Sequence, residues 1–256
     1  LVYVVVCLTG QKFSTDYLNI GWQLIPWDIL STDPLRSVAY LHVQPPLWNL
    51  ILGTTAWLSP FSDRFTLQAL MALIGVSVAW LSAALASRLG MSRRASIVVA
   101  LIATLHPEVF KNVFEPTYEL VTAALLLLVL IAVADLAHTE NVRRSLVVLS
   151  SVVTITALTR SLYHPVWAIL IVIFGLWLMR HRINWKSTIL VLSIPIILMG
   201  GWMAKNQVLF GHSTMSSWFG MNLQRAVIPV LPQEDLNEMY AKGQISDIAM
   251  IGPFGK

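Results

Sequence analysis

The stretch YLHVQPPLWNLILGTTAW, Tyr40 to Trp57, decides the fold, because it either crosses a membrane or lies along one. It begins with polar residues, turns at Pro45 and Pro46, and then runs apolar for about a dozen residues. Its course determines on which side of the membrane the preceding polar loop, 10–45, lies.

The composition indicates an integral membrane protein. Of the 256 residues, 56% are hydrophobic and only 12% are charged, whereas soluble domains carry about 25% charged residues. The apolar residues form blocks that approach the roughly 20 residues needed to cross a bilayer, separated by short charged loops. We therefore predict an all-α fold, a polytopic bundle of membrane helices. The net charge of +4 is typical of basic cytoplasmic loops and indicates no nucleic-acid partner.

The apolar blocks predict the domain organisation. A transmembrane domain is expected over 1–205, with loop and juxtamembrane helices within 10–60, followed by a non-cytoplasmic soluble segment over 206–256. Leu1–Leu8 is predicted to be the end of a further span, so we expect missing residues at the N-terminus, and also after Lys256. The predicted complete spans are 66–88, 95–110, 117–137, 145–160, 165–180 and 187–204.

Three loops between these spans are rich in basic residues, which usually face the cytoplasm. Two predicted spans separate each basic loop from the next, so the chain crosses the membrane twice and returns to the same side. All three loops can therefore be cytoplasmic. If 46–60 crossed the membrane, loop 10–45 would also be cytoplasmic. Because the block is short, polar at Asn49 and Thr54 and preceded by two prolines, we predict that it lies at the interface; a short, tilted span is the alternative. The basic residues are Arg88, Arg93, Arg94, Arg143, Arg144, Arg180, Arg182 and Lys186.

With 46–60 at the interface, the unusual polar residues gather on the non-cytoplasmic face. Charge near a membrane boundary is costly unless it is used or paired, although interface residues are also often simply hydrated. Asp16 has no local capping role and is the candidate general base. Asp33 is predicted to cap a helix that begins at Pro34, breaking an amphipathic helix over 26–41. A helix is also predicted over 233–242 in the tail.

Several kinds of chemistry have no support in the sequence. There is no DxD, HExxH or paired-histidine spacing for a metal, and no glycine-rich nucleotide motif or GxSxG motif. Cys7 is the single cysteine, so no intrachain disulfide forms. We expect no cofactor, and a divalent metal shared with a substrate phosphate is left open without being indicated.

Several motifs follow one another along the chain: Asp16 in the first loop, HVQPPL (42–47), Arg64, the basic SRLGMSRR and a span that closes at LHP (105–107). Their order resembles that in the GT-C superfamily of polyprenyl-phosphate-sugar-dependent glycosyltransferases. The most similar branch is the family-39-like one, with protein O-mannosyltransferases and aminoarabinose transferases. The resemblance covers about 1–205 and implies that HVQPPL begins a juxtamembrane helix. That family usually has an Asp-Glu pair before a tyrosine, whereas here Asp16 alone precedes Tyr17.

The resemblance implies transfer of a sugar from a polyprenyl-phosphate donor to a lipid, glycan or protein acceptor, with inversion. Such a reaction needs a carboxylate base, here Asp16, and cations for the leaving phosphate. Arg64, Arg160 and Lys205 are the candidate phosphate ligands; Arg64 is equally explained as a partner of Asp63. Further candidates for substrate binding are His42, Gln44, Glu115, His164, Trp218 and Asn222.

Most of these secondary candidates also have structural explanations. His42 and His164 stand at helix entrances, where a histidine is often a cap, and Glu119 is adequately explained as a favourable charge at a helix N-terminus. Trp218 is equally typical of a membrane-interface anchor.

The rival to an enzyme is a non-catalytic GT-C-like accessory or scaffold subunit; a transporter ranks lower, because no internal repeat is present. The expected partners are the donor, membrane lipids and associated subunits. The expected location is a bacterial inner membrane with a periplasmic active face, or the endoplasmic reticulum membrane.

Overall fold

A computed structural model describes residues 12–20, 24–218, 230–245 and 250, and within these ranges every regular element is a helix. The chain forms two compact units, Leu1–Met215 and Ser216–Lys256, and each is described by itself. The first unit contains α2 (Tyr17–Ile20), α3 (Trp27–Thr32), α4 (Pro34–Ala39), α5 (Leu47–Leu58), α6 (Asp63–Arg88), α7 (Arg93–Leu105), α8 (Pro107–Asn112), α9 (Tyr118–Leu136), α10 (Val142–Thr159), α11 (Pro165–Leu178) and α12 (Trp185–Phe210).

Four helices are long and apolar enough to cross a membrane: α6, α9, α10 and α12. They correspond to four of the predicted spans and support the prediction of a membrane protein. The predicted span 95–110 is wrong in extent, because α7 ends at Leu105 and Pro107 starts α8 with His106 as its N-cap. With 14 residues, α11 is also shorter than the roughly 20 residues that a full span needs. The predicted span end Leu1–Leu8 lies outside the described residues.

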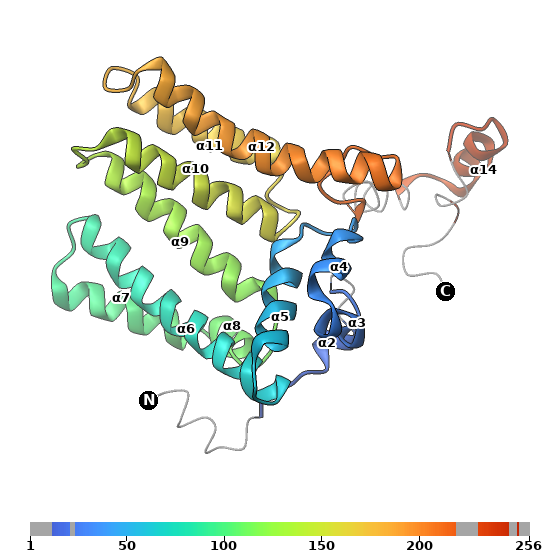
Figure 1. The fold of residues 1–256 in the computed structure, drawn as a ribbon, viewed down its shortest axis with the longest axis horizontal. Helices are drawn as coiled ribbons and strands as arrows, with labels where there is room; N and C mark the ends of the chain where they lie inside the picture. Colours follow the sequence, from blue (N-terminus) through green and yellow to red (C-terminus); the bar gives the residue numbers. More distant parts are fainter. Residues whose placement is uncertain (1–11, 21–23, 219–229, 246–249, 251–256) are drawn as a thin grey trace. The chain divides into compact units, whose positions relative to one another are not determined.

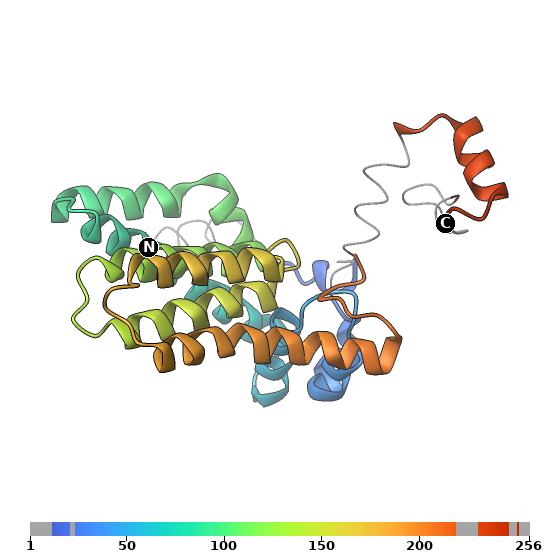
Figure 2. The ribbon, with the colours of Figure 1, turned by 90° about the horizontal axis from the view of Figure 1, so that it is seen from above.

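The long helices of the first unit pack side by side, with α6 between α7 and α9, and α10 between α9 and the pair α11–α12. The connections α6–α7, α9–α10 and α11–α12, which carry the three groups of basic residues, all lie at one end of these helices (Figure 1 and Figure 2). The connections α8–α9 and α10–α11 lie at the opposite end. The shared end of the three basic loops agrees with the arrangement predicted from their charge.

Helix α5 occupies the end opposite the basic loops and runs across the helix ends instead of alongside the helices (Figure 1). Its 12 residues extend about 18 Å, less than the roughly 30 Å of a hydrocarbon core. Gly53 allows α5 to approach α3 and α4 closely, since a Cβ there would lie 2.7 Å from Pro34 Cβ and 2.8 Å from Leu30 Cδ1. The length and course of α5 agree with the prediction that 46–60 is not a span.

The helix break predicted at Asp33–Pro34 is confirmed. Asp33 is the N-cap of α4, its Oδ1 accepts from the backbone N–H of Arg36 at 3.1 Å, and Pro34 occupies the first turn. The indole of Trp27 in α3 donates to Asp63 Oδ2 at 2.8 Å, which ties this pair of short helices to the start of α6.

The second unit contains one helix of the described tail, α14 (Gln233–Ala241), which confirms the prediction over 233–242. Two acids, Glu234 and Asp235, lie in its first turn, where the helix dipole favours negative charge. Lys242 forms a salt bridge with Glu238 one turn earlier.

Candidate functional site

The end of α10 and the start of α9 bring together an arginine, a carboxylate and a tyrosine. Arg160 is the C-cap of α10, and Glu119 lies in the first turn of α9. Arg160 Nη2 lies 3.8 Å from Glu119 Oε1, and the guanidinium carbon lies 4.4 Å from the centroid of the Tyr118 ring. With Tyr17, these residues are called the Arg160 group.

The first loop is fixed beside the start of α9 by its backbone. The Ser14 N–H donates to the Phe114 carbonyl at 2.9 Å, and Ser14 Oγ accepts from the Asp16 N–H at 3.2 Å. Asp16 is exposed, and its carboxylate makes no hydrogen bond or salt bridge with other residues of the described ranges. The carboxylate is therefore available to a substrate.

Tyr17, the neighbour of Asp16, interacts electrostatically with the Arg160 group. Burial, helped by the nearby Tyr118 and Glu119, raises the pKa of its phenol to about 12, although Arg160 acts in the opposite direction. The phenol thus remains protonated at neutral pH and can donate a hydrogen bond.

A second cluster forms where α12 ends, and it is called the Lys205 group: His42, Lys205, Phe210 and His212. Lys205 Nζ donates to the carbonyl of Leu41 and lies 5.3 Å from the centroid of the Phe210 ring. The His42 ring centroid lies 4.5 Å from that of Phe210 and 5.6 Å from that of His212. Partial burial lowers the pKa of His42, and His212 and Lys205 lower it further.

The turn after α12 explains why this cluster forms. Gly211 adopts φ +77°, a left-handed conformation that ends the helix and redirects the chain. The returning segment is held by Asn206 Nδ2, which donates to the Thr214 carbonyl at 2.7 Å, and by Trp202 Nε1, which donates to the Met215 carbonyl at 3.1 Å.

Each group keeps one buried polar atom for a further partner. Glu119 Oε2 in the Arg160 group and His212 Nε2 in the Lys205 group form no hydrogen bond with the described residues; the same holds for Asn206 Oδ1 and Trp48 Nε1 outside the two groups. A buried polar atom without a partner is costly. These atoms are places where a ligand or water would be stabilised.

The structure does not bring all predicted site residues together. Arg64 is exposed in the first turn of α6, at the other end of α5 from His42, and Asp63 accepts from Trp27. Gln44 is buried just before α5, and Glu115 is half-buried between α8 and α9, where it also raises the pKa of Tyr17.

The remaining candidates lie elsewhere. His164 is exposed as the N-cap of α11 and its Nδ1 accepts from the Val166 N–H at 3.3 Å, as the capping alternative predicted. Trp218 belongs to the second unit and is half-buried, and Asn222 lies outside the described residues.

Sequence reasoning missed four members of these clusters. Tyr17 and Tyr118 were not expected to contribute side chains, and Phe210 and His212 received no role. For Glu119, a favourable charge at the helix N-terminus was preferred to the cavity-facing acid that the resemblance implies, and its pairing with Arg160 was not expected. The one signal in the sequence was Gly211 directly before His212, which is typical of a helix end that turns back.

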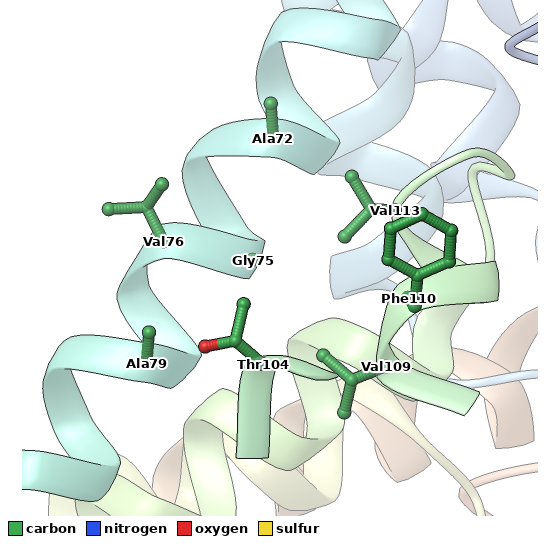
Figure 3. Close-up of a pocket in the computed structure, with 8 residues that line it drawn as sticks. All are labelled: Ala72, Gly75, Val76, Ala79, Thr104, Val109, Phe110 and Val113. Carbon is green, nitrogen blue, oxygen red and sulfur yellow. The ribbon is translucent and has the colours of Figure 1, made fainter. Parts of the chain in front are cut away.

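An apolar cavity of about 290 Å³ lies between α6, α7 and α8 (Figure 3). It is lined by Gly75 and Val76 from α6, Thr104 from α7, Phe110 from α8 and Val113, the C-cap of α8. The Thr104 hydroxyl donates to the Ala100 carbonyl at 2.7 Å, so it does not require a polar ligand.

Among the described residues, no three His, Cys, Asp or Glu side chains are close enough to hold a metal ion. Comparisons of the chain with protein-family models, curated proteins and solved structures found no match.

Proposed function

We propose that this chain is a GT-C-type membrane glycosyltransferase that moves a sugar from a polyprenyl-phosphate donor to a lipid, glycan or protein acceptor. The observation that carries the proposal is the Arg160 group, which includes Tyr17, the residue that follows Asp16 in the chain. Residues from the first loop, α9 and α10 converge at the end of the helices opposite the basic loops. The reaction requires a carboxylate base and positive charge for the leaving phosphate, and Asp16 and Arg160 can supply them.

In the proposed reaction, the exposed carboxylate of Asp16 takes the proton of the acceptor hydroxyl. The acceptor oxygen attacks the anomeric carbon, the bond from that carbon to the phosphate oxygen breaks, and polyprenyl phosphate leaves. A single displacement inverts the anomeric centre. Glu119 is less suited to the role of base because its Oε1 faces Arg160.

The leaving phosphate needs positive charge and hydrogen-bond donors. Arg160 offers a planar fork with donors beyond its contact with Glu119, and Tyr17 adds a hydroxyl donor. Lys205 donates to only one protein carbonyl among the described contacts, so its ammonium retains further donors. The donor's hydrocarbon chain has a compatible site in the apolar cavity next to Val113 (Figure 3).

Asp16→Asn tests this function. The full chain, purified in detergent, is given polyprenyl-phosphate mannose, and release of polyprenyl phosphate is measured with and without acceptor extracts. Loss of an acid–base group is expected to reduce turnover by about 10²–10⁴-fold. Asp28→Asn, an equal charge change at an exposed position in α3, is the control.

The second candidate function, a non-catalytic accessory subunit, has a different outcome. It predicts no turnover by the wild-type chain with polyprenyl-phosphate mannose, glucose or aminoarabinose, and co-purification with a catalytic membrane protein. The departure from the family's Asp-Glu pair at Asp16 favours this alternative.

A further inference from the structure

A cavity of about 440 Å³ lies at the end of the helices that carries the basic loops, away from the Arg160 group. It is formed by the end of α9 and the start of α10. Its polar wall includes His138, Asn141 and Arg144, and its apolar wall is formed by Ala132 and Val148. None of these residues belongs to the Arg160 group or the Lys205 group.

The lining of this cavity includes one arginine, Arg144, and one acid, Asp135. The charge of Asp135 is balanced by Arg88, whose Nε lies 2.5 Å from Asp135 Oδ1. Arg182 Nη2 donates to the carbonyl of the lining residue Thr139 at 2.8 Å. Arg144 forms no salt bridge within the described part of the chain, so its guanidinium is available to an anion.

The local fold arranges donors around this cavity. Asn141 is the N-cap of α10, and its Oδ1 accepts from the Arg144 backbone N–H at 3.1 Å, which leaves its amide NH₂ as a donor. The Ser145 hydroxyl donates to Thr139 Oγ1 at 2.8 Å and fixes the loop against α10. Glu140 is exposed in the same loop but does not line the cavity.

The apolar wall indicates what kind of anion fits. Ala132 lies one turn inside α9 from Asp135, and Val148 lies one turn inside α10 from Arg144. Both helices are long and apolar enough to span a membrane, and Val148 is 46% exposed. A free phosphate would gain nothing from this surface, whereas a hydrocarbon chain would.

We propose that this cavity binds an anionic phospholipid, with its phosphate at Arg144 and Asn141 and an acyl chain along Val148. The site stands independently of the proposed enzyme activity, because it shares no residue with the glycosyl-transfer site. A lipid bound there joins the end of α9 to the start of α10 at the basic end of the helices.

The test compares two neighbouring arginines. Native mass spectrometry of the full chain in detergent measures adducts of phosphatidylglycerol and of phosphatidylcholine. We expect phosphatidylglycerol to bind in preference, and Arg144→Gln to weaken its binding by about tenfold. Arg143→Gln removes the same charge from an exposed residue that does not line the cavity, and its affinity should remain within about twofold of the wild type.

Three outcomes overturn the proposal. These are equal losses in the two arginine variants, equal binding of the two lipids, or displacement of the lipid by an equal concentration of glycerol phosphate, which would identify a simple phosphate site. If Arg144→Gln does not yield folded protein, His138→Gln serves as the second variant. A binding affinity in that variant equal to the wild type then counts against the site.

Discussion

Arg160 Nη2 lies 3.8 Å from Glu119 Oε1, so an arginine at the end of α10 faces a carboxylate at the start of α9. The arginine side chain is 29% exposed and the glutamate side chain 40% exposed. Pairs as exposed as this contribute only about 0–1 kcal/mol to stability. The pair therefore contributes little to folding, which is consistent with the binding role proposed for Arg160.

Arg160→Gln is expected to separate activity from stability. Loss of one charged donor to a leaving phosphate should reduce turnover by about 10²–10³-fold, while the free energy of unfolding falls by no more than about 1 kcal/mol. Turnover with polyprenyl-phosphate mannose and thermal unfolding in detergent measure the two effects. Arg36→Gln, at an exposed position in α4, is the matched control; an equal loss in both variants would refute a specific role for Arg160.

Tyr17 is expected to ionise late in an alkaline titration. Its folded pKa of about 12 lies above the ordinary value of 10.0, so its contribution to stability is complete below pH 10 and is lost as the pH rises toward 12. Absorbance of the phenolate, followed from pH 9 upward, should show a step near pH 12 that Tyr17→Phe removes. Tyr40→Phe is the control and should leave that step intact. If the step near pH 12 persisted in Tyr17→Phe, the packing described for Tyr17 would be contradicted.

The protein is expected to lose stability in mild acid because of His42. Its folded pKa lies below the ordinary 6.5, so the unfolded chain binds the proton first. The contribution of His42 is therefore complete above pH 6.5 and is lost as the pH falls toward the folded pKa. Melting temperatures at pH 7.5 and pH 5 should differ less in His42→Gln than in the wild type, and His181→Gln, in an exposed loop, should leave the difference unchanged. A pH response in His42→Gln equal to that of the wild type would contradict the packing of His42 in the Lys205 group.

Gly53→Ala tests whether α5 is packed closely on the short helices α3 and α4. The added Cβ would lie 2.7 Å from Pro34 Cβ, and we expect overpacking to cost about 1–3 kcal/mol of unfolding free energy. In Gly200→Ala, also within a helix, the new Cβ meets no atom within 4 Å, and stability should be unchanged or rise by about 1 kcal/mol. Thermal unfolding in detergent measures both; equal stability of the two variants would show that α5 lies farther from α3 and α4.

Much of the fold could be predicted because its signals are local. Length and hydropathy mark α6, α9, α10 and α12, and an aspartate before a proline marks the break between α3 and α4. The early end of α7 is also local, since Pro107 forbids a continuous helix, but the apolar pattern concealed it.

The site was less predictable because its contacts join distant parts of the chain. Lys205 reaches a carbonyl 164 positions away, at Leu41, and no local pattern records that contact. The pairing of Arg160 with Glu119 likewise depends on how α9 and α10 pack. Capping explained Glu119 well enough from the sequence that its partner could not be inferred.

The central claim is that Asp16 and the start of α6 lie on the same side of a membrane, opposite the basic loops. Single cysteines replace Ser14, Ser62 and His181 in a Cys7→Ser background, and a membrane-impermeant thiol reagent is applied to oriented vesicles. We predict that positions 14 and 62 are labelled from one side and position 181 from the other. Labelling of positions 14 and 62 from opposite sides would make α5 a true span and contradict the account.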